Sequence, residues 1–185
     1  MAGSPPDCAT AKEPHIEIRL NKVQQLFNSL DPSPFINRDL DDDAEAYILD
    51  SLSELPQRHG VELFIYLPPS EIERQSVEEL AAAIHSYFGY RHTVTRHRLR
   101  ALFRRGRISL LIGVIFLSVC YFLSQIIGFP GRPYLEELLK QGLLIIGWVA
   151  NWRPLEIFLY DWWPVQREAR LYGLLSRIPV RVLPS

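Results

Sequence analysis

The pattern of hydrophobic and polar positions changes abruptly at Ile108. From Ile108 to Phe129 the chain runs for 22 residues without a charged side chain. At a rise of about 1.5 Å per residue, a helix of this length covers about 33 Å, enough to cross the hydrocarbon core of a bilayer. The pattern therefore predicts a membrane-spanning helix at 108–129.

Before this run the pattern predicts strands at two places. Residues 15–20 alternate strictly, with Ile16 and Ile18 on one side, which is typical of a half-buried strand. Residues 61–67 are nearly all apolar and predict a strand in the interior of a sheet. These two strands belong to a predicted cytoplasmic α/β domain over 15–90.

Helical spacing predicts the helices of the same domain. Apolar residues recur every three or four positions over 21–30, from Asp41 to Leu55 with Tyr47 on the buried side, and from Ser70 onward. The last pattern resumes after Gly89, so one long helix is predicted to lead into the bilayer. The polar, proline-containing segment 1–14 predicts a disordered tail.

The second apolar segment allows two interpretations, because only residues 141–152 lack charge between Lys140 and Arg153. Either a helix runs from about 135 to 160 through Pro154, or it ends at Trp152 and an interfacial helix follows at 155–163. We favour a second crossing, which gives a transmembrane hairpin over 108–163 with a short external loop. The hairpin is expected to pack through small residues: Ser109, Gly113 and Gly147.

The C-terminal segment 164–185 is predicted to be a cytoplasmic tail. It begins as a helix, and residues 178–183 then alternate like a strand, with Pro179 suited to a sheet edge. Because two strands alone are marginal, this segment is predicted to complete the sheet as a third strand, with a free tail as the alternative. The fold class is thus a membrane α-helical hairpin plus a small cytoplasmic α/β domain.

Charge is strongly segregated although the net charge is only −1. Residues 1–90 sum to −10, residues 91–107 to +7 and residues 108–185 to +2. The basic segment is a juxtamembrane helix that we call the arginine collar: Arg91, Arg96, Arg98, Arg100, Arg104, Arg105 and Arg107. Its position predicts contact with anionic lipid headgroups and retention in the cytoplasm, in preference to an acidic protein surface or nucleic acid. The basic C-terminal tail places both termini there.

Polar residues near the second apolar segment are the candidate functional site. Asn151, Arg153, Glu156 and Asp161 would lie near membrane depth, where ionisable groups often mark pathways. Because they lie toward the cytoplasmic end, a structural ion pair or a partner contact is preferred to transport. Four tryptophans are predicted interface anchors: Trp148, Trp152, Trp162 and Trp163.

Motifs for catalysis or cofactors are not found in the sequence. None of the five histidines follows residue 97, so paired histidines at membrane depth cannot hold a haem. Cys8 and Cys120 make no disulfide framework, and the aspartates at 39 and 41–43 fit a helix N-terminus better than a calcium loop. We therefore expect no enzyme activity, metal or cofactor.

Two segments resemble an uncharacterised family of small two-helix bacterial inner-membrane proteins. They are Gly142–Pro164, which contains NWRPLEIFLYDWWP, and Phe27–Phe35 with the sequence FNSLDPSPF. The resemblance implies a bacterial inner (cytoplasmic) membrane location and no particular activity.

These features predict a non-enzymatic membrane-anchored adaptor or accessory subunit. Its cytoplasmic domain would bind a partner protein or another copy of the chain, and its hairpin would dock in the bilayer or in a larger membrane complex. The alternatives are an oligomeric transporter or channel component that uses Arg153, Glu156 and Asp161, and an enzyme acting on a bound lipid or quinone.

Overall fold

The computed structural model describes residues 14–55, 60–74, 76–128 and 133–185. Almost all of the predicted N-terminal tail, the centre of the predicted external loop, Cys8 and His59 lie outside these residues. The described part of the chain is mostly helical, with two long apolar helices and a small three-stranded parallel sheet.

The elements follow one another in the order β1 (His15–Arg19), η1 (Val23–Leu26), η2 (Phe35–Asn37), α1 (Asp42–Glu54), β2 (Glu62–Leu67), α2 (Pro69–Ile72), α3 (Val77–Ile126), α4 (Pro133–Val149), α5 (Trp152–Glu156), η3 (Ile157–Asp161), α6 (Trp162–Leu175) and β3 (Val180–Pro184). The elements η1 and η2 are 3₁₀ helices, and η3 is a π-helix.

The chain forms two compact units. Residues 1–92 and 170–185 make up one unit, which we call the head, and residues 93–169 make up the other, which we call the hairpin. The helices α3 and α6 each contribute residues to both units. The C-terminal strand β3 therefore belongs to the same unit as β1, the first described strand.

The sheet of the head has the strand order β1-β2-β3, and both pairs are parallel. Its register aligns Ile16 with Leu63 and Leu63 with Val180. The prediction of a C-terminal third strand is confirmed, although the strand begins two residues later than expected because Pro179 precedes it. The apolar strand β2 is central, as its sequence predicts.

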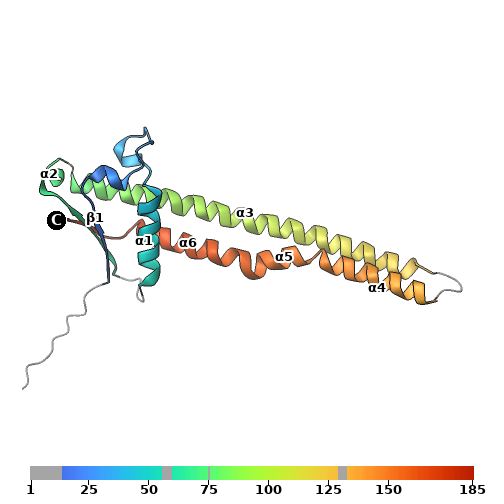
Figure 1. Cartoon of the computed structure of the whole chain (residues 1–185). Helices are drawn as coiled ribbons and strands as arrows, with labels where there is room; N and C mark the ends of the chain where they lie inside the picture. Colours follow the sequence, from blue (N-terminus) through green and yellow to red (C-terminus); the bar gives the residue numbers. More distant parts are fainter. Residues whose placement is uncertain (1–13, 56–59, 75, 129–132) are drawn as a thin grey trace, which may run out of the picture. The chain divides into compact units, whose positions relative to one another are not determined.

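The core of the head lies between the sheet and three helices that cover one of its faces: α1, the first turns of α3 and the last turns of α6 (Figure 1). Alternate residues of β2 point into it, so Leu63, Ile65 and Leu67 are buried while their neighbours are half-buried. The helices contribute side chains such as Ile48, Leu52, Leu80, Ile84, Phe88, Tyr172 and Leu175.

Two predictions about the head are wrong in detail. Residues 21–30 form only the four-residue helix η1, because Phe27 leaves the helical conformation to make a bridge with Leu40. In α1 the side chain of Tyr47 is 54% exposed, whereas Glu45 is buried. The rest of α1 agrees with prediction, since Asp41 caps its first turn by accepting a hydrogen bond from the backbone N–H of Asp43 at 3.1 Å.

The predicted helix from Ser70 is divided. Pro69–Ile72 forms the single turn α2, and α3 starts separately at Val77. From there α3 continues without interruption past Gly89 to Ile126, so that glycine does not break it. A helical glycine costs only about 1 kcal/mol relative to alanine, which the packing of the surrounding turns can offset.

Candidate functional site

The second apolar segment contains a break that lies between the two interpretations of the sequence. The helix α4 ends at Val149, and α5 begins at Trp152. Proline cannot donate a backbone hydrogen bond and clashes with the carbonyl four residues earlier, so an uninterrupted helix through Pro154 is unfavourable. The break places Pro154 in the first turn of α5, where its missing N–H matters least.

The structure brings three of the four predicted polar residues together just after this break. Arg153 pairs with Glu156 at 2.9 Å and with Asp161 at 3.4 Å. The indole N–H of Trp152 also donates to Glu156, at 3.0 Å. One guanidinium therefore serves two carboxylates, and the group carries a net charge of −1. Since the Arg153 side chain is 67% exposed, the pairs face outward rather than into the hairpin.

Asn151, the fourth predicted residue, takes no part in these ion pairs and instead links the two long helices of the hairpin by hydrogen bonds. Its side-chain amide donates to the carbonyl of Gly113 on α3 at 3.2 Å and to the carbonyl of Gly147 on α4 at 3.0 Å. A Cβ at position 113 would lie only 2.6 Å from the Asn151 side-chain oxygen. Gly113 is thus the residue that lets this amide reach the backbone of α3.

Small residues continue the contact along the hairpin. A Cβ at Gly147 would lie 2.9 Å from a methyl of Leu117 and 3.2 Å from Cys120, and one at Gly106 would lie 2.9 Å from Ile157. Gly106, Gly113 and Cys120 are spaced by seven residues, the spacing of a left-handed helical seam. The sequence analysis predicted packing at Gly113 and Gly147. It did not predict packing at Gly106, because this glycine lies between two arginines and outside the apolar run.

The arginine collar divides into two groups. Arg96, Arg98, Arg100, Arg104, Arg105 and Arg107 are exposed and make no ion pair within the described residues. Arg91 instead points into the head, where one guanidinium nitrogen lies 2.8 Å from Glu45. Arg91 therefore belongs to an internal network and not to the exposed collar.

The four tryptophans also differ from one another. Trp148, Trp152 and Trp163 are 59% to 65% exposed, as side chains at a lipid interface would be. Trp162 is half-buried: its ring lies 6.1 Å from that of Phe103, and its N–H donates to the carbonyl of Phe158 at 2.8 Å. Trp162 is therefore part of the packing between α3 and the return segment of the hairpin.

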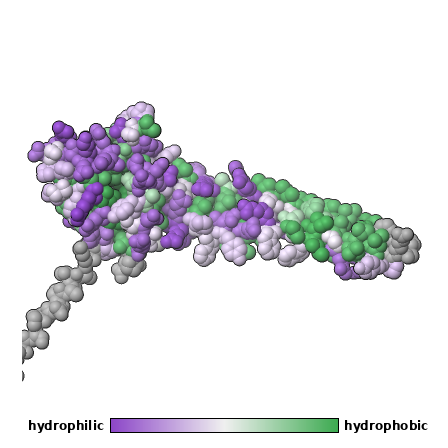
Figure 2. All heavy atoms as spheres, viewed as in Figure 1, coloured by the Kyte–Doolittle hydropathy of each residue, from purple (hydrophilic) through white to green (hydrophobic). Residues whose placement is uncertain are grey.

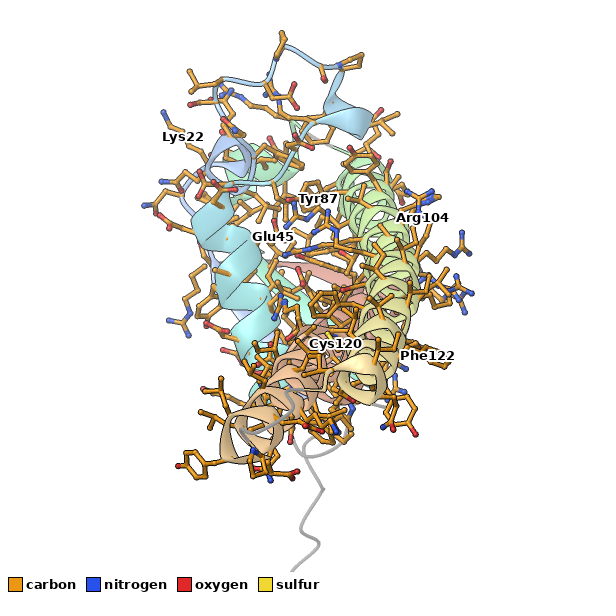
Figure 3. The ribbon with its side chains drawn as sticks, turned by 90° about the vertical axis from the view of Figure 1, so that its right-hand side faces the viewer. Lys22, Glu45, Tyr87, Arg104, Cys120 and Phe122 are labelled. Atoms are coloured by element: carbon orange, nitrogen blue, oxygen red, sulfur yellow. The ribbon has the colours of Figure 1, made fainter. Side chains whose placement is uncertain are left out.

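A buried network in the head is the feature that sequence reasoning missed. Glu45 accepts hydrogen bonds from the hydroxyls of Tyr87 and Tyr172, and Arg91 donates to the Tyr172 hydroxyl at 2.9 Å (Figure 3). Figure 3 shows Glu45 of α1 and Tyr87 of α3 turned toward each other. The network connects α1, α3 and α6, which are far apart in sequence, so no local spacing could indicate it.

Burial and neighbouring charges shift the pKa values of three side chains in the network: Tyr87, Tyr172 and Arg91. Desolvation, followed by the hydrogen bond to Glu45, raises the pKa of both Tyr87 and Tyr172 well above 10. For Arg91 desolvation acts in the opposite direction, but the bond to Tyr172 and the charge of Glu45 outweigh it and raise its pKa. At neutral pH the two phenols are therefore neutral and Arg91 is charged, and the hydrogen bonds of the network give it a structural role.

The histidines and aspartates take local structural positions. His85 forms a hydrogen bond of 2.7 Å with the carbonyl of Ile178, just before β3. Asp41, Asp42 and Asp43 lie at the start of α1, as predicted. Among the described residues no group of three side chains is arranged to hold a metal ion.

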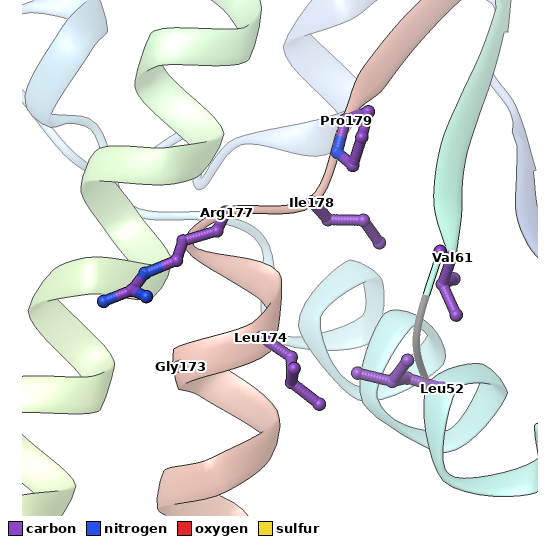
Figure 4. A pocket seen from close by; sticks show the side chains of 8 residues that line it. Leu52, Val61, Gly173, Leu174, Arg177, Ile178 and Pro179 are labelled. Carbon is purple, nitrogen blue, oxygen red and sulfur yellow. The ribbon is translucent and has the colours of Figure 1, made fainter. Parts of the chain in front are cut away.

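The head also has an apolar hollow of about 240 Å³ beside the start of β2 (Figure 4). Leu52, Val61, Leu174 and Ile178 point toward it, whereas the Arg177 side chain points away (Figure 4). Most of the lining is apolar, so this hollow holds no cluster of polar side chains that would orient a ligand.

Comparison with known proteins gives no relatives: no family model, no curated protein and no solved structure matches the chain.

Proposed function

We propose that the chain is an integral membrane protein, an adaptor or accessory subunit whose hairpin anchors a partner-binding head. The observation that carries the proposal is the exposure of the hairpin's apolar side chains (Figure 2). The most apolar 18-residue windows of its two long helical segments are only 17% and 22% buried. Core helices of soluble proteins bury such residues, whereas a bilayer solvates them.

The lengths of the two helical segments are compatible with a bilayer. Residues 108–126 of α3 would cover about 28 Å, close to the thickness of a hydrocarbon core. On the return segment the charge-free residues 141–152 cover only about 18 Å, so the crossing also needs Lys140, which pairs with Glu136 at 2.6 Å, and Arg153 to extend their long side chains to the two interfaces. The polar group at Arg153 would then lie at the opposite interface.

The topology of the sheet supports placing both termini on the same side. The strands β2 and β3 pair directly, yet the entire hairpin lies between them in sequence. A chain that crossed a bilayer an odd number of times could not pair these strands. We therefore propose two crossings, with the exposed collar arginines and the head on the cytoplasmic side of a bacterial inner membrane.

Cysteine accessibility tests this topology. In a variant without Cys8 and Cys120, single cysteines replace Leu30, Ser185 or Tyr134, of which Leu30 and Tyr134 are 88% and 81% exposed. A membrane-impermeant maleimide should label Y134C in intact cells and label L30C and S185C only after lysis. Labelling of L30C and S185C from opposite sides, or extraction of the protein by alkaline carbonate, would overturn the proposal.

The paired polar group at Arg153 favours the adaptor over a transporter. Its charges are satisfied on one exposed helical surface, a geometry that suits an interfacial ion pair or a partner contact. In proteoliposomes we expect R153Q and E156Q, singly and together, to leave ion leakage at the level of empty vesicles. A selective flux that either substitution abolishes while the protein stays inserted would instead support the transporter alternative.

A further inference from the structure

The packing of the hairpin aligns the centres of its two charge-free runs. The run 108–129 has its midpoint beside Ser118, and the run 141–152 has its midpoint beside Gly147. A Cβ at Gly147 would lie 3.2 Å from that of Cys120, so the two midpoints are at nearly the same level along the hairpin. In the membrane anchor proposed above, on which this inference rests, that level is the centre of the bilayer.

Trp148 lies within about 3 Å of this level, because it follows Gly147 directly in the helix. Its side chain is 62% exposed. Unlike the indole N–H groups of Trp152 and Trp162, that of Trp148 has no hydrogen-bond partner among the described residues. Headgroups and water begin about 15 Å from the bilayer centre, too far away to accept a hydrogen bond from it. An unpaired donor is unfavourable in hydrocarbon, which favours an acceptor from a second protein molecule in the membrane.

The exposed polar side chains in the apolar part of α3 all lie on one face. They are Ser118, Tyr121 and Gln125, at the spacing i, i+3 and i+7. At about 100° per residue, this face lies about 120° around α3 from the side that packs against the return segment, where Gly113 and Cys120 are. These polar side chains are therefore turned away from the contact between the helices of one hairpin.

The helix α4 has a matching face. Gln141 and Trp148 are both exposed and lie seven residues apart, so they share one side of the helix. This side lies about 110° around α4 from Gly147, which packs against α3. Both offsets have the same rotational sense along the chain, and the helices run in opposite directions, so the two faces lie on one side of the hairpin. We call that side the polar face.

The polar groups on the two helices also match in depth. Ser118 and Trp148 both lie within about 3 Å of the midpoint level. Gln125 and Gln141 lie about 10 and 8 Å from that level, both toward the loop and still within the hydrocarbon core. A rotation about the bilayer normal leaves every residue at its depth. A second copy turned about such an axis thus presents Ser118 at the level of Trp148, and Gln125 at the level of Gln141.

We propose that two copies of the chain form a two-fold symmetric dimer through the polar faces of their hairpins. In this dimer the indole N–H of Trp148 donates to the hydroxyl oxygen of Ser118 in the other copy. Ser118 itself donates to the carbonyl of Val114 at 2.8 Å, which leaves its oxygen free to accept. The side-chain amides of Gln125 and Gln141 pair across the same contact. The occupant is a second copy because the donors and acceptors of one chain already match in depth.

Removal of the central hydrogen bond tests the contact in the full-length protein in mild detergent. We expect the wild type to have the mass of two chains. S118A and W148F should each weaken the dimer at least about fivefold, since each removes two symmetric hydrogen bonds. The double variant should lose no more than the more affected single variant, because both substitutions remove the same bond. The mass of the complex at decreasing protein concentration is the readout, and additive losses would contradict the pairing.

Crosslinking between copies tests the orientation of the face without changing these residues. In the variant without Cys8 and Cys120, one tagged copy carries Y121C and a differently tagged copy carries L144C; the two positions lie at the same depth on the polar face. We expect a crosslinked pair that contains both tags. The matched control is F122C with L144C, because Phe122 is the next residue of α3, is 65% exposed and lies on the side opposite the return segment. Equal crosslinking at 121 and 122 would sink the proposal.

The remaining outcomes separate the dimer from its competitors. A monomeric wild type, or a ring of more than two copies, would overturn the two-fold contact. Release of a different membrane protein by W148F, with no dimer present, would assign the polar face to that protein instead. The maleimide labelling reports on membrane anchoring alone, so a monomer that labels as expected refutes the dimer and leaves the anchor standing.

Discussion

The head and the hairpin use the same kinds of side chain for opposite purposes. In the head Phe88 is fully buried in a core built from both ends of the chain. In the hairpin Phe122 is 65% exposed, although it belongs to the same helix, α3. The head excludes water from its core by packing on itself, whereas the hairpin leaves its apolar side chains exposed, as the proposed membrane anchor requires. Burial, not hydrophobicity, distinguishes the two regions.

Replacing one phenylalanine by alanine in each region should give the largest difference in the free energy of unfolding. We expect F88A to lower the free energy of unfolding of the head by about 3 to 5 kcal/mol, because it leaves a cavity in a packed core. F122A removes an exposed side chain, which in the proposed anchor meets only lipid, and should change this free energy by less than about 0.5 kcal/mol. Denaturant titration in detergent, followed by a probe in the head, measures both. Equal losses would contradict the division into two regions.

Gly113 allows the packing within the hairpin to be tested separately. We expect G113V to destabilise the contact between its helices by about 1 to 3 kcal/mol, because any Cβ there meets the Asn151 side chain. The matched control is G142A, since a Cβ at Gly142 meets nothing within 4 Å. Crosslinking between cysteines on α3 and α4 measures the contact. Indifference to G113V would mean that the amide of Asn151 does not join the helices.

Alkaline pH should affect the head through its two buried tyrosines. Their pKa values are raised on folding, so the unfolded chain releases these protons first, near pH 10. Stability is therefore complete below pH 10 and falls above it, by up to about 1.4 kcal/mol per pH unit for each tyrosine. Thermal melting between pH 8 and 11 measures the slope, and Y87F/Y172F should flatten it. A wild-type slope equal to that of the variant would contradict the buried network.

Local sequence patterns predicted most of the helices and strands, because the spacing of apolar residues follows the buried face of each element. The alternation at 15–20, the start of a helix near Asp41 and the apolar strand 61–67 all appear as expected. The patterns failed where distant residues decide the outcome. The backbone of Phe27 forms a β-bridge with Leu40 instead of continuing a helix. The side chain of Arg91 forms a salt bridge with Glu45 on α1, whereas the other collar arginines are exposed. A run of arginines in sequence does not reveal which one turns inward.

The sequence alone determined the apolar run from Ile108, the arginines beside it and the strand-like C-terminus, because length, charge and periodicity are properties of a single segment. Only the tertiary structure decided that the sheet is parallel, that Gly113 accommodates Asn151 and that Glu45 gathers two tyrosines and an arginine. Those features depend on which segments meet in space. Their energies come from close packing and from the burial of paired polar groups, which no single segment can provide.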